Sequence, residues 1–219
     1  MGLVDEAEYH FFHFFPYSDR PADHRERASL WVDFSNANYD PTVGHDLYNR
    51  YLSEMLLADK LGYDGLVLNE HHNTQYSMNA APNLTAAALI PQTSCWINVF
   101  GTPPNLGYPN RLAEEYAMLD VMSGGRLRVA FPLGTGMEYW ANAVNPATAR
   151  ARFRESIDII LHCWTDDGPR SYEGDFYTYR YLNPWPRPLQ QPHPECYIVG
   201  TGSPETIELA AELGFGYSV

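Results

Sequence analysis

Two hydrophobic patterns alternate along this chain. Short continuous apolar runs predict buried strands, and longer stretches with apolar residues every three or four positions predict amphipathic helices. Residues 171–182 alternate around Gly174-Asp175 and predict a hairpin, whereas residues 17–45 are polar and predict a long loop. The other predicted strands are 9–15, 65–69, 95–100, 126–133, 196–200 and 216–219, and the predicted helices are 46–61, 83–93, 110–122, 147–164 and 204–213.

These elements form strand–helix units in series, which is typical of a parallel α/β fold with right-handed crossovers. A doubly wound open sheet and a (β/α)8 TIM barrel both satisfy this order. The first strand–helix turn carries no Gly-rich dinucleotide fingerprint, which favours the barrel. Five units and the start of a sixth strand are present, whereas a complete barrel typically needs about 250 residues. We therefore expect a single domain over residues 1–219: an incomplete TIM barrel, either the N-terminal part of a longer one or a naturally shortened one.

The chain is acidic, with a formal net charge of -13 over 219 residues. Such a surface repels phosphate backbones and anionic lipid, so we expect neither nucleic acid nor membrane as a partner. The N-terminus lacks the basic-then-apolar pattern of a signal peptide, and no apolar run approaches the roughly 20 residues of a membrane span. Cys95, Cys163 and Cys196 are far apart and odd in number, which predicts reduced core thiols in a cytoplasmic protein.

The strand predicted at 65–69 delivers Glu70, His71 and His72 to its C-terminal end, where parallel α/β folds bind ligands. These side chains could bind a metal, form structural hydrogen bonds or act in general acid–base catalysis. Adjacent strand positions point to opposite sides, so we expect at most one imidazole to face a pocket. Because metal ligands must converge, a metal site is the least favoured alternative and an acid–base imidazole the preferred one.

Glycine-rich turns follow three other predicted strands. The turn after 196–200 leads into a helix, so the Ser203 and Thr206 hydroxyls beside Gly202 and the free helix N–H groups suit a phosphate. The alternative is that Ser203 only caps the helix. Glycine in the other two turns lets a ligand approach the backbone, or simply forms the turn. Those turns hold Gly101-Thr102 and Gly134-Thr135.

Several segments together resemble the bacterial luciferase-like flavin-dependent monooxygenases. They occur in the family's order, extend over nearly the whole chain and are specific in combination. The segments are 61–72, 111–127, 152–165 with 172–177, 186–194 and 202–211.

The resemblance implies a TIM barrel that binds reduced FMN from a separate reductase and activates O2 through a flavin hydroperoxide, oxidising a small organic substrate. By position, His71 resembles the imidazole near the flavin, with His72 beside it. Ser203 and Thr206 fall where the family binds the FMN phosphate, and Gly101-Thr102 falls beneath the isoalloxazine. The family usually forms homodimers, so we expect one here. Aromatic residues such as Phe12, Phe14 and Trp140 suit an apolar substrate at the barrel mouth, or else belong to the core.

Two positions depart from the luciferases. Leu133 stands where luciferases have a phosphate-binding Arg. Arg111 is a candidate substitute, but on an outer helix a surface ion pair is the favoured interpretation of it. Pro132 stands where they have a reactive Cys, so no thiol role carries over. These departures argue against light emission. Three alternatives stay open: a deazaflavin (F420)-dependent oxidoreductase, a non-catalytic FMN-binding shortened relative, and an incomplete fragment with exposed barrel edges.

Overall fold

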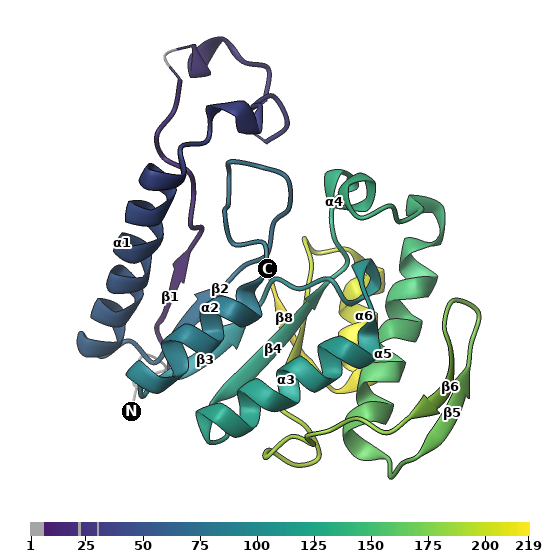
Figure 1. Ribbon diagram of the computed structural model, residues 1–219. Helices are drawn as coiled ribbons and strands as arrows, with labels where there is room; N and C mark the ends of the chain where they lie inside the picture. The colour runs from purple at the N-terminus through teal and green to yellow at the C-terminus, as the bar shows by residue number, and fades with distance from the viewer. Residues whose placement is uncertain (1–6, 22, 30) are drawn as a thin grey trace.

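The computed structural model describes residues 7–21, 23–29 and 31–219; residues 1–6, 22 and 30 of the predicted domain and loop lie outside the described residues. Its centre is a six-stranded sheet in which every neighbouring pair is parallel. The sheet order follows the chain order without the reversal that a doubly wound sheet requires. The structure is therefore a curled half-barrel, as Figure 1 shows, and the open-sheet alternative is wrong. The strands are β1 (His10–His13), β2 (Gly65–Leu68), β3 (Trp96–Val99), β4 (Leu127–Pro132), β7 (Glu195–Val199) and β8 (Gly216–Ser218).

Helices surround the arc of strands in Figure 1, and a small hairpin lies beside α5. The hairpin pairs antiparallel strands β5 (Arg170–Glu173) and β6 (Thr178–Leu182), as its alternation predicted. The helices are α1 (Pro41–Lys60), α2 (Pro82–Leu89), α3 (Pro109–Ser123), α4 (Gly136–Ala141), α5 (Ala149–Thr165) and α6 (Pro204–Leu213).

The two faces of each strand have different environments because successive side chains point to opposite sides. In β4, Val129 and Phe131 are fully buried in the hydrophobic core, whereas Arg128 and Pro132 line a cavity on the other face. In β3, Ile97 is in the core and Asn98 lines that cavity. The core therefore lies between sheet and helices, and the concave face remains available for a site.

Three predicted boundaries are wrong for identifiable reasons. Helix α1 begins at Pro41 instead of residue 46, because the Asp40 side chain accepts a hydrogen bond from the Thr42 N–H (2.7 Å) and proline suits the first turn. Strand β1 ends at His13 because the buried Phe15 has a φ of 54°. Helix α2 ends at Leu89 and continues as a 3-10 turn around Pro91, which lacks an N–H group.

Helix α4 is absent from the sequence prediction, which placed no helix between residues 122 and 147. The loop predicted at 17–45 contains two short 3-10 turns, His24–Glu26 and Asn36–Asn38. Across the described ranges, no helix combines the length and apolarity needed to cross a membrane. The same ranges hold no group of three or more His, Cys, Asp and Glu side chains placed to bind a metal.

Candidate active site

The concave face of the sheet and the loops at the carboxyl ends of its strands enclose a cavity of about 790 Å³. That volume lies within the roughly 300–1,000 Å³ of pockets that bind cofactor-sized ligands. The cavity brings together predicted site residues from four separate segments of the chain. The sequence-predicted residues that line it are Glu70, His71, Gly101, Gly134, Thr135, Ser203 and Thr206.

The other predicted site residues lie nearby but not on this cavity. His72 and Thr102 line a second cavity on the far side of the 69–72 loop, and Glu70 borders both cavities. The Gly202 N–H donates a hydrogen bond to the Tyr217 hydroxyl (2.8 Å). The two histidines therefore face different cavities, as the alternation of side chains predicted.

His71 is the imidazole that faces the large cavity. Its Nδ1 lies 2.9 Å from Oε1 of Glu138, and only 18% of the histidine side chain is exposed. The ring is parallel to Phe14 (centroids 6.2 Å apart) and contacts Trp31 edge-on (4.7 Å). Tyr76 lies against the same imidazole at 5.8 Å. Three aromatic rings and a carboxylate thus fix the orientation of this side chain.

Glu138 is a site residue that the sequence prediction missed. It is on α4, it is buried, and its Oε2 accepts a hydrogen bond from the Thr135 N–H (2.8 Å). Burial alone raises the pKa of Glu138, but the hydrogen bonds from His71 and the Thr135 N–H outweigh burial and bring its pKa below the ordinary value. A signal was present: Thr135 and Glu138 have the T-x-x-E spacing of a helix capping box.

His72 pairs with the other carboxylate of the motif. Its Nε2 lies 2.8 Å from Oε1 of Glu70, and this hydrogen bond raises the pKa of His72 in spite of the burial that opposes it. Gly101 lies directly against this loop: a Cβ there would collide with the Glu70 backbone nitrogen. A glycine at residue 101 thus allows the end of β3 to pack against the loop that holds the histidines.

The turn before α6 has the features expected of an anion site. The Ser203 hydroxyl does not cap the helix; its Oγ lies 2.9 Å from Oγ1 of the largely buried Thr206, and both residues line the cavity. Arg150, at the start of α5, lines the same cavity and also an adjoining hollow with Thr206 and Glu205. No local sequence pattern points to Arg150, because only the fold brings it to a turn more than 50 residues away.

Arg111 is not part of the cavity. It pairs with Glu115 on the same helix (Nε to Oε1, 2.8 Å), which is the surface ion pair that its place on an outer helix favoured. Leu133, at which the resemblance predicts the place of a luciferase arginine, also lines the cavity. Phe12 and Phe14 also line it. Trp140 is 78% exposed and is not among the lining residues of the described chain, so its predicted place at the mouth is wrong.

The amino end of the cavity carries charges that the sequence prediction also missed. The Arg128 guanidinium contacts Glu8, pairs with Glu195 (2.7 Å) and lies over the Trp96 ring at 4.2 Å. Asn98 donates a hydrogen bond to the Leu66 carbonyl (3.1 Å) beside this group. Because Arg128 is already paired with two carboxylates, Arg150 is the arginine of the described cavity lining that remains for a ligand phosphate.

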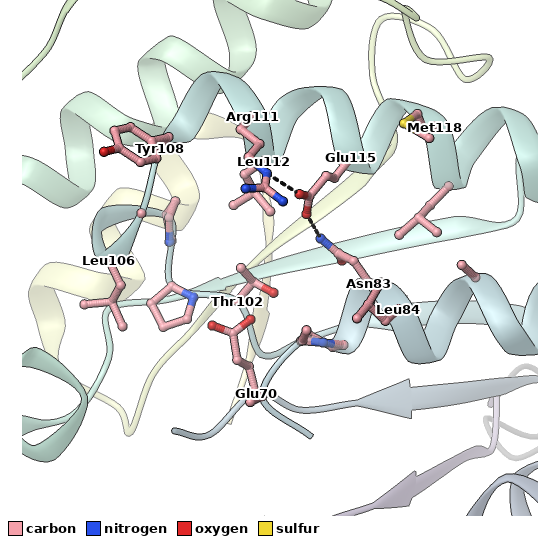
Figure 2. Close-up of a pocket in the computed structure, with 18 of the residues that line it drawn as sticks. Glu70, Asn83, Leu84, Thr102, Leu106, Tyr108, Arg111, Leu112, Glu115 and Met118 are labelled. Carbon is pink, nitrogen blue, oxygen red and sulfur yellow. Dashed lines mark hydrogen bonds and ion pairs between the residues drawn. The ribbon is translucent and has the colours of Figure 1, made fainter. Parts of the chain in front are cut away.

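The second cavity, of about 540 Å³, lies between α2, α3 and the 102–108 loop. Figure 2 shows Glu70 and Thr102 on one side of it and Leu112, Glu115 and Arg111 on α3. The Asn83 amide donates to Glu115 (2.7 Å) and ties α2 to α3. The exposed apolar side chains on these two helices and the loop between them are Leu84, Tyr108, Met118, Val121 and Met122.

Comparison with known proteins gives this architecture a family. A profile described as luciferase-like monooxygenase matches residues 17–219. The chain belongs to the luciferase-like monooxygenase family. The resemblance drawn from the sequence motifs is therefore confirmed.

Individual relatives in this luciferase-like family include both flavin and deazaflavin enzymes. The oxygenase component of a flavin-dependent trigonelline monooxygenase from Acinetobacter baylyi is 28% identical over 88% of this chain and 54% of that protein. An F420-dependent glucose-6-phosphate dehydrogenase from Microbacterium testaceum is 27% identical over 77% of this chain and 52% of that protein. The crystal structure of the monooxygenase RslO1 from Streptomyces bottropensis superimposes with a TM-score of 0.79 and 25% identity, covering 97% of this chain and 59% of that one. The chain spans about half the length of the curated relatives that it matches.

Proposed function

We propose that this luciferase-like protein is a flavin-dependent monooxygenase, which uses reduced FMN and O2 to oxidise a small apolar organic molecule. The observation that carries the proposal is one cavity that joins an oriented imidazole, His71, to an anion-binding turn at Ser203 and Thr206. The family supports an oxidoreductase. We propose that the described sheet and helices act as one cytoplasmic domain.

The residues present fit FMN. The Ser203 and Thr206 hydroxyls and the start of α6 suit its phosphate, and Arg150 adds a positive charge beside them. Phe12 and Phe14 give the cavity an apolar wall that excludes water from the reacting atoms. When bound, the reduced flavin supplies the electrons for O2 activation, which side chains alone do not provide. In this scheme His71 holds or accepts a proton at its ring nitrogen in the cavity.

Anaerobic ultrafiltration with reduced FMN tests the proposal directly. We expect saturable retention of flavin, and rapid mixing with aerated buffer should then give a reoxidation time course different from that of free reduced FMN. Replacing both hydroxyls, Ser203→Ala with Thr206→Ala, should weaken retention by about tenfold or more, because hydrogen bonds to a charged group are lost. The matched control is Ser171→Ala with Thr178→Ala on the exposed hairpin.

The outcomes separate the alternatives. A folded chain that retains no reduced FMN refutes the cofactor assignment. Retention with the reoxidation kinetics of free flavin refutes the oxygenase and supports a non-catalytic flavin-binding protein. Preferential retention of reduced F420 supports the deazaflavin alternative, which the Microbacterium relative brings into consideration.

A separate flavin reductase is part of the proposal, since the Acinetobacter relative is named as an oxygenase component. We also propose that a second copy of the chain covers the apolar face of α2 and α3. Leu84 is 74% exposed there, on the rim of the second cavity in Figure 2. Light scattering should give a dimer mass for the wild type and a monomer mass for Leu84→Glu. A wild-type monomer at working concentrations contradicts this pairing.

A further inference from the structure

We propose that Glu138 is a positioning residue for His71: its carboxylate accepts the Nδ1 proton and leaves Nε2 as the nitrogen that exchanges protons in the cavity. The catalytic use of that nitrogen rests on the proposed function. The positioning itself is a property of the ligand-free chain and is tested there.

The geometry of Glu138 supports this role. Its side chain is only 4% exposed, so the carboxylate lacks the water that solvates surface glutamates. The two oxygens have separate partners: Oε1 lies 2.9 Å from His71 Nδ1, and Oε2 accepts the Thr135 N–H at 2.8 Å. A carboxylate only accepts hydrogen bonds, so the nitrogen of His71 that faces it must carry a proton. Glu138 therefore selects one tautomer of the neutral imidazole.

The surroundings of His71 prevent the ring from escaping this selection. Phe14 and Trp31 contact the imidazole from segments far from α4, and Tyr76 contacts it from the loop after the histidines. A flipped ring would direct Cδ2 instead of Nδ1 at the buried carboxylate and leave it without its partner, which is costly in a buried site. Among the described residues, no hydrogen bond is found from His71 Nε2 to another side chain. That nitrogen is therefore the one available to a ligand.

The charged groups around the imidazole come from two segments. Glu138 on α4 is the direct partner, and Glu70 and His72 belong to the same loop as His71. Glu70 is paired with His72 at 2.8 Å, so it does not compete for His71. Tyr76 is the remaining titratable contact, through its ring.

Glu138 also connects the imidazole to the turn that holds Gly134 and Thr135. Gly134 has a φ of +95°, which only glycine adopts readily, and the Thr135 N–H is held by the same carboxylate that binds His71. A ligand that moves the Thr135 backbone thus acts on the carboxylate that orients the imidazole.

Nitrogen-15 NMR of the histidine side chains in the ligand-free protein tests the proposal. We expect His71, assigned by loss of its signals in His71→Asn, to be protonated at Nδ1 in its neutral form. Glu138→Gln is nearly isosteric but has a single acceptor oxygen for two N–H donors. It should shift the Nδ1-H to Nε2-H ratio by about tenfold towards Nε2-H, the tautomer preferred without a partner. Glu70→Gln is the matched control and should change His72 while leaving the His71 ratio unaltered.

An unchanged His71 tautomer in Glu138→Gln, with the native circular dichroism spectrum, overturns the proposal. If that variant does not fold, Glu138→Asp offers a second test, since it keeps a carboxylate but shortens the side chain that reaches His71 Nδ1. The proposal requires it to shift the His71 ratio towards Nε2-H as well, and an unchanged ratio there counts against it. The two proposals can fail separately. If the His71 tautomer changes in Glu138→Gln but the protein binds no reduced FMN, the positioning role is supported and the proposed function is refuted.

Discussion

Asp120 provides a quantitative test of how the connector between the hairpin and β7 is fixed. Its side chain is fully buried on α3 and binds Gln190 twice: Oδ2 accepts the backbone N–H at 2.8 Å, and Oδ1 accepts the side-chain Nε2 at 2.6 Å. Gln190 Nε2 also donates to the Leu127 carbonyl (2.7 Å) at the start of β4. One carboxylate thus holds the connector to the helix and to the sheet.

The substitution Asp120→Asn keeps the size of the side chain but changes one acceptor into a donor. One charge-assisted hydrogen bond is lost, which removes about 1.5–3 kcal/mol of stabilisation. An N–H group of the new amide then faces another N–H in a buried site, which costs about 1–3 kcal/mol more. Because Asp120 has no exposed surface, solvent does not relieve the mismatch. We expect the free energy of unfolding to fall by about 3 kcal/mol, or the Tm to fall by roughly 6–12 °C at about 2–4 °C per kcal/mol.

Urea unfolding followed by tryptophan fluorescence measures this loss, since Trp164 lies in the core beside the same connector. The matched control is Asp175→Asn at the exposed hairpin turn, for which we expect a change within about 0.5 kcal/mol. A loss below about 1 kcal/mol for Asp120→Asn would mean that the connector is held by its prolines and apolar contacts, and would refute the reasoning.

Three further predictions concern the site. The pKa of Glu138 is lowered in the folded protein, so its ionised form stabilises the fold above the unfolded pKa of about 4.3. This stabilisation is lost as the pH falls through the folded pKa. In that acidic window, the free energy of unfolding measured with urea should therefore depend less on pH in Glu138→Gln than in the wild type. The pKa of His72 is raised in the folded protein, so its cationic form stabilises the fold fully below about pH 6.5, and this contribution is lost as the pH rises through the folded pKa. Glu70→Gln should make the free energy of unfolding depend less on pH over that range. An unchanged pH dependence contradicts the pairing of His72 with Glu70. Arg150→Gln should weaken the retention of reduced FMN by about tenfold at low salt and by less at high salt, because salt screens the charge. The control Arg180→Gln, on the hairpin, should have no effect. Equal losses of retention in the two variants would exclude a phosphate contact from Arg150.

The sequence predicted those parts of the site that lie on long, regular elements. The turn before α6 was found because a strand, glycines and a first-turn proline succeed one another within a few residues, and α6 (Pro204–Leu213) has the predicted bounds. Helix α4 was missed because six residues, Gly136–Ala141, are too few to show helical periodicity. Glu138 was missed with it, although the Thr135–Glu138 spacing held the information.

Contacts between residues that are distant in sequence could not be predicted from local patterns. Arg150 meets the turn at Ser203 only because α5 lies beside α6, and no local pattern records that placement. Arg111 was a reasonable substitute by charge, yet its helix turns it towards Glu115 and the second cavity. Charge type is readable from sequence, but the direction of a side chain on a helix depends on which face the core selects.

The polar residues within the strands give an argument for the barrel that is independent of strand order. A doubly wound parallel sheet is covered by helices on both faces, and its strands are near-continuous apolar runs. Here β3 carries Asn98 and β4 carries Arg128 on the face opposite the core. Under a second layer of helices, the Arg128 guanidinium would need its partners Glu8 and Glu195 to be buried as well, at a desolvation cost of several kcal/mol per ion. Such residues are tolerated in strands that face a cavity, so the composition of β3 and β4 already favours a concave, ligand-accessible sheet.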